Sequence, residues 1–300
     1  MALDVGIVGP PGSGKTTLFT ALTGVRPEGY GTPHVGVAPI ADDRLPSIAQ
    51  VVKSAKETPA TIRLIDVPGT ASAQLGGVRR SDALLGVVRD AADLTSLELE
   101  LLVADRDHVE RRLERVRKEA KSGDPKLRTE AELLERLIAH IDDERAVRDW
   151  PGELPAELEP LTAKPLIPIV NGPGGVDLAL EAELRDLPAE EAAEYRNGGS
   201  STLEDVVRQL ASILDLVTFF TAGDTETRAW TLRNGKTALD AAESIHTDIA
   251  RGFIRCEVIG WNDLVETGSH AEAARRGLQR LEGKGYVVAD GDVLNIRFNV

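Results

Sequence analysis

The sequence predicts an α/β domain that is interrupted by a pair of helices and followed by a small α+β domain. Strand and helix patterns alternate over residues 1–92 and return over residues 160–215, which is typical of a parallel sheet covered by helices. Residues 93–159 show helical periodicity without strand signals. Residues 216–300 contain several short strand patterns around one helix pattern. We therefore expect one α/β domain in two segments, an inserted helical hairpin and a C-terminal domain.

The composition of the chain excludes several classes of protein. The 300 residues are 42% hydrophobic and 28% charged, as in an ordinary globular protein. The net charge of -14 argues against strong sequence-independent binding to nucleic acid, because neutralising phosphates requires Lys and Arg. The single cysteine, Cys256, excludes a disulfide framework, a cysteine-rich zinc site and an iron–sulfur cluster.

The sequence also predicts where the protein resides. No apolar run approaches the roughly 18 residues that span a membrane, and the N-terminus lacks the basic segment of a signal peptide. A lone cysteine fits a reducing compartment. We therefore expect a cytoplasmic protein that does not contact a membrane, and we expect it to be a monomer.

A glycine-rich loop between a strand and a helix carries the clearest chemical signal. The apolar run Leu3–Val8 predicts a buried parallel strand, and residues 9–16 then read Gly-Pro-Pro-Gly-Ser-Gly-Lys-Thr. This is the phosphate-binding pattern G-x-x-x-x-G-K-[ST]. A helix pattern follows and ends at Gly24, a typical C-cap. A chance Gly/Pro turn is the alternative, and the order of strand, loop and helix disfavours it.

Each residue type in this loop has a role in binding a polyphosphate. Glycines let successive backbone N–H groups face one anion, and the helix N-terminus adds partial positive charge. We expect Lys15 to stabilise the charge of the phosphates during catalysis and the Thr16 hydroxyl to ligate Mg²⁺. The residues predicted to bind the phosphates are Pro11, Gly12, Ser13, Gly14, Lys15, Thr16 and Thr17.

A second motif adds candidates for the metal and the γ-phosphate. The strand pattern Thr61–Ile65 ends in Asp66-Val67-Pro68-Gly69, a D-x-x-G sequence. An aspartate there can hold Mg²⁺, and the Gly69 N–H can bond a γ-phosphate. Thr32 is a further candidate metal ligand. An aspartate at the end of a strand is common by itself, but its distance after the phosphate-binding loop favours the functional interpretation.

Distinctive sequence blocks are spread along nearly the whole chain. They are Pro33–Pro39, Asp43–Leu45, Leu161–Pro165, Phe219–Gly223, Ile245–Asp248, Gly252–Arg255 and Asp290–Val293. Together with the two motifs, they resemble the Obg-like ATPases of the YchF type, a branch of the P-loop NTPases. The resemblance implies an ATP- or GTP-binding domain that uses Mg²⁺, a coiled-coil insertion and a C-terminal TGS domain of the β-grasp type. It also implies association with the ribosome or ribosomal RNA.

The periodicity of the inserted segment itself predicts an antiparallel coiled-coil hairpin. Apolar residues recur at helical spacing on both sides of a break at Ser122–Pro125. We favour a solvated face with interleaved acidic residues, Asp105 among them, over a contact surface for RNA or a ribosome. The basic residues of the first arm are Arg106, Arg111, Arg112, Arg115, Arg117, Lys118 and Lys121.

The region expected to read the base departs from the family. The family uses an Asn with a Glu two residues later, whereas Asn171 is followed by Gly172–Gly175 and then by a short segment. We keep Asn171 as a candidate nucleotide contact and expect phosphate binding with weak base selectivity. Thr70 stands where signalling GTPases place a water-orienting Gln. No residue is therefore identified as the catalytic base, and hydrolysis should be slow.

Three functions fit these observations. The leading hypothesis is a ribosome-associated switch that binds Mg–ATP or Mg–GTP and alters the loops Thr32–Gly36 and Gly69–Gly76 with nucleotide state. The second is a nucleotide-independent interaction module on a degenerate NTPase core, and the intact Gly9–Thr16 loop argues against it. The third is a P-loop kinase of a small molecule, which would leave the C-terminal resemblance unexplained.

Overall fold

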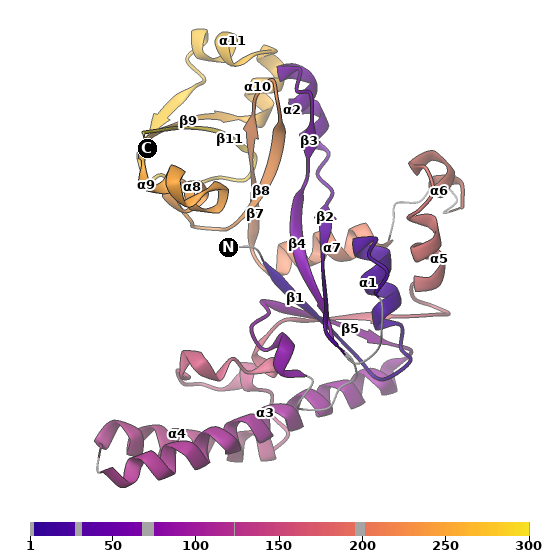
Figure 1. Cartoon of the computed structure of the whole chain (residues 1–300), viewed down its shortest axis with the longest axis vertical. Coiled ribbons are helices and arrows are strands. Elements are labelled where there is room, and N and C mark those ends of the chain that lie inside the picture. Colours follow the sequence, from indigo (N-terminus) through magenta and orange to yellow (C-terminus); the bar gives the residue numbers. More distant parts are fainter. Residues whose placement is uncertain (1–2, 28–31, 68–74, 123, 196–201, 300) are drawn as a thin grey trace. The chain divides into compact units, whose positions relative to one another are not determined.

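The computed structural model describes residues 3–27, 32–67, 75–122, 124–195 and 202–299 (Figure 1). Among these residues, close contacts define two compact units. Residues 3–37 and 63–195 form the unit that contains the glycine-rich loop, and residues 38–62 and 202–299 form the other. No helix of the described residues is long and apolar enough to cross a membrane.

The unit with the glycine-rich loop is built on a five-stranded sheet in the order β2-β4-β1-β5-β6. Strand β1 pairs in parallel with β4 and with β5, and β5 pairs in parallel with β6. All six residues of β5 are buried, as expected for a strand covered on both faces. Pro168 lies in β6 at the edge of the sheet, where a proline is tolerated because no neighbouring strand needs its missing N–H. The strands are β1 (Asp4–Val8), β2 (His34–Ile40), β4 (Ala60–Asp66), β5 (Ala83–Val88) and β6 (Leu166–Val170).

Helices α1 and α5 pack side by side in this unit (Figure 1). Helix α1 ends at Gly24, whose φ of 73° and N–H bond to Thr20 O confirm the predicted C-cap. Arg185 donates from Nη1 to the carbonyls of Ala21 and Leu22, so α5 also satisfies the end of α1. The elements are α1 (Lys15–Thr23), the 3-10 turn η1 (Leu75–Val78), α5 (Leu178–Leu184) and α6 (Ala189–Tyr195).

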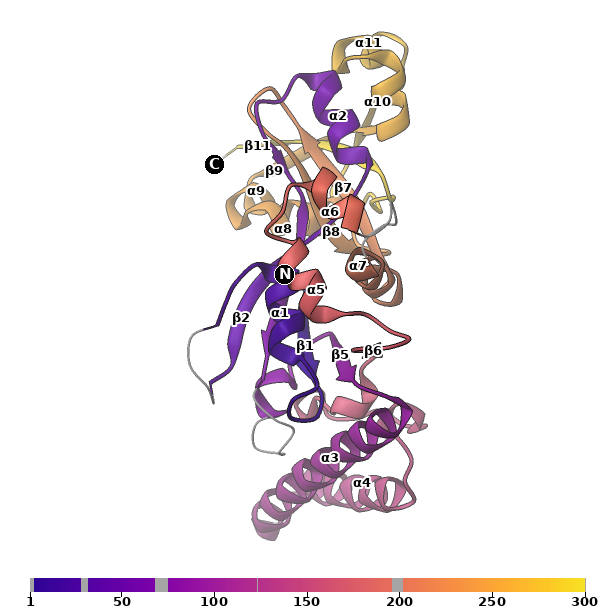
Figure 2. The same cartoon turned by 90° about the vertical axis from the view of Figure 1, so that its right-hand side faces the viewer.

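Two long helices, α3 (Ala91–Glu119) and α4 (Pro125–Asp142), pack against each other where the helical pair was expected (Figure 2). Asp124 starts α4 by accepting from Lys126 N, and Pro125 follows it at the first helical position. The 3-10 turns of this region are η2 (Ala120–Ser122), η3 (Val147–Asp149), η4 (Ala156–Leu158) and η5 (Leu161–Ala163). The buried apolar residues of the pair and the segment after it are Leu102, Val109, Leu113, Val116, Ala131, Leu134, Leu137, Ile141, Val147 and Leu158.

Basic side chains of α3 form ion pairs with acidic residues of α4. Arg106 pairs with Asp142 at 2.7 Å, Arg112 with Glu130 at 2.8 Å and Arg117 with Glu135 at 2.7 Å. Exposed pairs of this kind contribute only about 0–1 kcal/mol each. They pair three of the seven basic residues of this arm with acidic residues of α4, as expected for a solvated face.

Asp105 of α3 is buried, so the prediction that it is one of the solvated acidic residues of this arm is wrong. Its carboxylate accepts from Arg79 Nη1 at 2.7 Å and from the backbone N–H groups of Leu161 and Thr162 at 2.8 Å each. The Thr162 hydroxyl donates to it as well, at 2.8 Å. Helical periodicity alone does not show whether an acidic residue is exposed to solvent or covered by a later segment of the chain. Asp105 therefore ties α3 to the segment that leads into β6.

The other unit contains a mixed six-stranded sheet in the order β10-β9-β11-β7-β8-β3. Strands β7 and β8 are antiparallel, as are β9 and β11, whereas β11 and β7 run in parallel. Short strands around α8 agree with the strand patterns and the one helix pattern expected over residues 216–300, whereas β10 and the short helices α9, α10 and α11 were not predicted. The strands are β3 (Glu57–Thr58), β7 (Leu216–Ala222), β8 (Thr227–Arg233), β9 (Phe253–Gly260), β10 (Arg280–Glu282) and β11 (Asp292–Phe298). The helices are α2 (Arg44–Val52), α7 (Thr202–Ile213), α8 (Ala238–Ile245), α9 (Thr247–Arg251), α10 (Trp261–Thr267) and α11 (His270–Arg275).

Residues 38–62 belong to this unit because they are bonded into it. Strand β3 pairs in parallel with β8, and the Ser54 hydroxyl donates to Gly223 O at 2.5 Å. Arg44 forms ion pairs with Asp42 at 2.7 Å and with Asp290 at 2.6 Å, and these hydrogen bonds raise the pKa of Arg44. The segment between β2 and β4 thus groups with the C-terminal residues.

We expect Asp105→Ala to lower the free energy of unfolding by about 3–5 kcal/mol, because Arg79 would remain buried without a counter-charge. Urea denaturation followed by circular dichroism measures the change. Glu114→Ala, at an exposed position of the same helix, is the control and should change stability by less than about 0.5 kcal/mol. Equal effects of the two variants would contradict a structural role for the buried pair.

Candidate functional site

The glycine-rich loop runs from β1 into α1 with a backbone that requires glycine. Gly9 has a φ of +148°, and a Cβ there would lie 2.2 Å from Val87 O of β5. Gly14 has a φ of +106°, and a Cβ there would lie 2.5 Å from Asn171 Nδ2. A side chain at Gly9 would displace the loop from β5, and one at Gly14 would displace the Asn171 amide. The sequence pattern therefore reflects a close approach of the loop to β5 and to Asn171.

The N-terminus of α1 is arranged to receive an anion. Gly14 is its N-cap and supplies no side-chain cap, and the first turn contains no acidic residue. N–H groups in a first helical turn lack acceptors within the helix, and the helix dipole places partial positive charge there. Ser13 Oγ is buried and has no hydrogen-bond partner among the described residues. Donors near one point without internal partners are typical of a phosphate site.

Lys15 lies inside this loop. Its Nζ donates to Gly9 O at 2.8 Å and to Pro10 O at 3.1 Å, and the residue is only 8% exposed. Burial lowers the pKa of Lys15, while the charges of Asp66 and Glu100 act in the opposite direction. An ammonium group has three donors, so one remains for a ligand. A bound polyphosphate would supply negative charge next to the buried Lys15 ammonium and so stabilise its protonated form.

Thr16 and Asp66, predicted from separate motifs, lie together. The Thr16 hydroxyl donates to Asp66 Oδ2 at 2.8 Å, and the Asp66 side chain is 3% exposed. Asp66 Oδ1 is buried without a hydrogen-bond partner among the described residues. A hydroxyl beside a carboxylate with an unused oxygen is the donor set that a hard divalent cation such as Mg²⁺ uses. The residues present therefore fit the predicted metal.

His34 also lies at this position and was not predicted. Its Nδ1 is 3.6 Å from Asp66 Oδ2, and its side chain is 19% exposed. His34 lies within the block Pro33–Pro39, but nothing in the sequence places it beside Asp66. Thr32 itself is exposed, and Gly69 lies outside the described residues. Their predicted roles stay predictions.

Asn171 follows β6 and contacts the glycine-rich loop. Its Nδ2 donates to Ser13 O at 2.8 Å, and its Oδ1 accepts from Leu178 N at 3.3 Å. It therefore links the loop to the start of α5. After it, the backbone turns through Gly172–Gly175, and Val176 forms a bridge back to Asn171.

The turn and α5 replace the region that would read a base. Asp177 caps α5 by accepting from Ala179 N and Leu180 N, each at 3.1 Å. Within the described residues, the parallel sheet ends at β6. No carboxylate therefore stands two residues beyond Asn171, in agreement with the shortening expected from the sequence.

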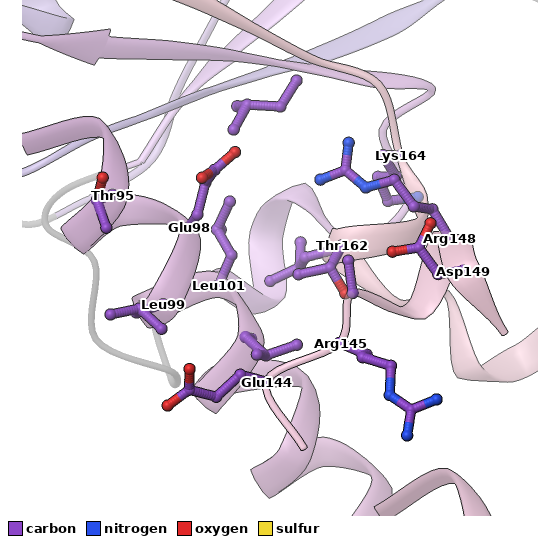
Figure 3. A pocket seen from close by; sticks show the side chains of 14 residues that line it. Thr95, Glu98, Leu99, Leu101, Glu144, Arg145, Arg148, Asp149, Thr162 and Lys164 are labelled. Carbon is purple, nitrogen blue, oxygen red and sulfur yellow. The ribbon is translucent and has the colours of Figure 1, made fainter. Parts of the chain in front are cut away.

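A cavity of about 460 Å³ lies elsewhere in this unit, beside the N-terminal half of α3 (Figure 3). Its walls come from α3 and from the segments around Arg145 and Lys164, and none of its lining residues belongs to the glycine-rich loop. Burial lowers the pKa of Lys164. Charged groups of both signs surround the cavity, which distinguishes it from the cationic loop.

The loop on a parallel sheet, its buried lysine and the Thr16–Asp66 pair define a P-loop domain of the GTPase type. A family model described as "50S ribosome-binding GTPase" matches residues 4–128. A second model, for the C-terminal domain of YchF GTPases and described as "Protein of unknown function (DUF933)", matches residues 216–299.

Relatives and a solved structure match the whole chain. "Ribosome-binding ATPase YchF" of Bacillus subtilis is 33% identical over 366 residues, with complete coverage of both chains at 100%. "Obg-like ATPase 1" of Oryza sativa subsp. japonica is 30% identical over 364 residues, covering 99% of this chain and 92% of the relative. The structure of the Schizosaccharomyces pombe YchF GTPase matches with a TM-score of 0.79 and 26% identity, covering 98% of this chain and 97% of that one.

The chain therefore belongs to the YchF family of Obg-like ATPases. The alignment to the Bacillus subtilis relative is longer than the 300 residues of this chain, so that relative contains residues without a counterpart here. A shortened segment after Asn171 is consistent with this difference.

We expect Asn171→Ala to weaken binding of MgATP, MgGTP and Mg-tripolyphosphate by the same factor, about 3- to 10-fold. The reason is that the side chain bonds the loop at Ser13 O, and one hydrogen bond contributes about 1 kcal/mol. Isothermal titration calorimetry measures the three affinities. A loss confined to the two nucleotides, with tripolyphosphate unaffected, would instead show that Asn171 contacts the base or ribose.

Proposed function

We propose that the protein binds Mg²⁺ with ATP or GTP at the glycine-rich loop, hydrolyses the nucleotide slowly and acts as a ribosome-associated switch in the cytoplasm. The single observation that carries the proposal is the conformation of the loop around the buried Lys15. The phosphates would contact residues 11–17, with Thr16 and Asp66 at the metal. A bound Mg²⁺ would supply charge neutralisation to the phosphates.

Some residues of this chain would supply charge to the phosphates, and others would position the phosphates and the loop. Lys15 would hold positive charge against the phosphates, and the N–H groups at the start of α1 would orient them. Asp66 would hold the Thr16 hydroxyl in place, as it does through their 2.8 Å bond. Asn171 would keep the loop in register with α5. These contacts involve only phosphates and metal, so they favour no base.

Weak base selectivity follows from the turn after Asn171. Selection of guanine relies on a carboxylate that bonds two ring N–H groups, and a polar contact of that kind discriminates strongly. The exposed Gly172–Gly175 segment offers no such side chain. We propose that ATP and GTP compete for the site with similar affinities.

Slow hydrolysis follows from the lack of an identified catalytic base. Lys15 would stabilise charge, but an attacking water also needs a group that orients it. Thr70, at the position where signalling GTPases place a water-orienting Gln, lies outside the described residues. We propose turnover below about 1 per second, slower than the median enzyme.

A switch requires a connection between the site and the rest of the chain. Strand β2 begins at His34, beside Asp66, and ends at Ile40 in the residues that group with the C-terminal part. We propose that this strand transmits the nucleotide state to a coiled-coil arm over residues 93–159 and a TGS domain over residues 216–300. The α/β domain would comprise residues 1–92 and 160–215, and the protein would act as a monomer. Ribosome association rests on the names of the relatives, which describe those proteins as ribosome-binding.

We expect Lys15→Ala to reduce the affinity for MgATP at least about tenfold, because a charged hydrogen bond contributes about 1.5–3 kcal/mol. Calorimetry in the presence of Mg²⁺ measures the loss. Lys164→Ala, which changes a half-buried lysine of the same unit away from the loop, is the matched control and should leave the affinity unchanged. Wild-type protein that shows no saturable binding of ATP or GTP would contradict the proposal.

The dissociation constants of MgATP and MgGTP should differ by less than about tenfold, since Gly172–Gly175 lacks the carboxylate that would select guanine. Competition against a fluorescent ATP analogue measures both constants under one condition. A preference of more than a hundredfold for either nucleotide would show that a base pocket exists.

The alternative of a nucleotide-independent interaction module is tested with the same Lys15→Ala variant. Sedimentation with purified 70S ribosomes compares wild-type and variant protein with and without a non-hydrolysable nucleotide. A switch predicts that the nucleotide changes ribosome binding by the wild type and not by the variant. Identical binding in all four samples would favour the interaction module.

A further inference from the structure

Two side chains at the candidate metal site have polar atoms without partners. Both ring nitrogens of His34 are buried and accept or donate no hydrogen bond among the described residues, and the same holds for Asp66 Oδ1. A buried polar group without a partner costs about 1–3 kcal/mol. These atoms belong to neighbours, because His34 Nδ1 lies 3.6 Å from Asp66 Oδ2. Their positions indicate a bound group that both side chains share.

We propose that His34 is a nitrogen ligand of the divalent cation at this site, so that the site prefers Co²⁺ or Mn²⁺ over Mg²⁺. The inference rests on the proposed function, because it concerns the cation that accompanies the nucleotide. The ligands from the chain are then the Thr16 hydroxyl, an Asp66 oxygen and the His34 imidazole. Nucleotide phosphates and water complete the coordination.

The distances fit two ligands of one ion. Donors on adjacent corners of an octahedron with bonds of about 2.1 Å lie about 3.0 Å apart. Nδ1 of His34 and Oδ2 of Asp66 are 3.6 Å apart, so a rotation of the imidazole that moves Nδ1 by about half an ångström is sufficient. Thr16 Oγ1, at 2.8 Å from the same carboxylate oxygen, already has the separation of adjacent ligands.

The packing of β2 against α1 positions His34 for this role (Figure 2). A Cβ at Gly36 would lie 2.8 Å from Phe19 Cζ and 2.8 Å from Thr23 Cγ2, so the strand lies close against the side chains of the helix. The rings of Phe19 and His34 then lie 6.4 Å apart between centroids. The backbone near His34 is thus fixed by the same helix whose N-terminus forms the phosphate site.

The chemistry of the ligands determines which metal is preferred. Mg²⁺ is a hard cation that takes oxygen ligands and retains several waters. Imidazole is a better ligand for first-row transition ions, whose affinities for nitrogen sites rise from Mn²⁺ to Co²⁺. A site with one imidazole among oxygen ligands should therefore gain affinity for Co²⁺ and Mn²⁺ and gain little for Mg²⁺.

The test measures metal affinity and metal ligation instead of turnover. The full chain is saturated with a non-hydrolysable ATP analogue, and Co²⁺ and Mg²⁺ are titrated by calorimetry. We expect the ratio of Co²⁺ to Mg²⁺ affinity to fall at least about tenfold in His34→Ala, because loss of a nitrogen ligand weakens binding of Co²⁺ much more than binding of Mg²⁺. His34→Asn, which offers an amide oxygen, should lower the same ratio while retaining Mg²⁺ affinity. Val35→Ala, at an exposed position of the same strand, is the control and should leave the ratio unchanged.

Pulsed electron paramagnetic resonance of Mn²⁺ in the same complex gives a direct readout. We expect coupling to a nitrogen nucleus in wild-type protein and its loss in both His34 variants. Nucleotide binding with no nitrogen coupling, and a Co²⁺ to Mg²⁺ ratio that is equal in wild type and variants, would overturn the role of His34 alone. Absence of analogue binding with every metal would overturn the proposed function itself.

Discussion

The backbone of the glycine-rich loop is the constraint on which the rest of the candidate site depends. Gly9 lies so close to Val87 O that a side chain would separate the loop from β5, and Gly14 lies close to the Asn171 amide. This conformation places Lys15 against the loop carbonyls at the start of α1, where the first N–H groups lack acceptors within the helix. The glycines thus allow the strand, the turn and the helix to approach closely enough to form a phosphate-binding site.

Charge and burial act together around this loop. Lys15 and Asp66 are both buried, and each would be costly to bury if the other were distant. Their arrangement separates a cationic position for phosphate from an anionic position for metal, which is the division of charge that a metal–nucleotide complex presents. By contrast, the buried Asp105–Arg79 pair bonds only protein groups and serves the packing of α3.

The sequence predicted much of this arrangement because its motifs are local. The phosphate-binding pattern and the Gly24 cap depend on neighbours within a few residues, and the structure has both. Contacts that join distant segments were not predictable. The burial of Asp105 depends on Leu161 and Thr162, more than fifty residues later, and the grouping of residues 38–62 with the C-terminal part depends on β8 and Asp290. His34 was missed for the same reason, since its importance appears only when β2 brings it beside Asp66.

The central claim is that backbone N–H groups of this loop bind a polyphosphate. Amide NMR of isotopically labelled protein tests it directly, because a hydrogen bond to phosphate shifts the resonance of each donor N–H. On titration with Mg-tripolyphosphate, the account predicts large, saturable shifts of the amides of Gly12, Gly14, Lys15 and Thr16, with smaller shifts elsewhere. Saturable binding that leaves these four resonances in place, or no binding at millimolar concentration, would contradict it.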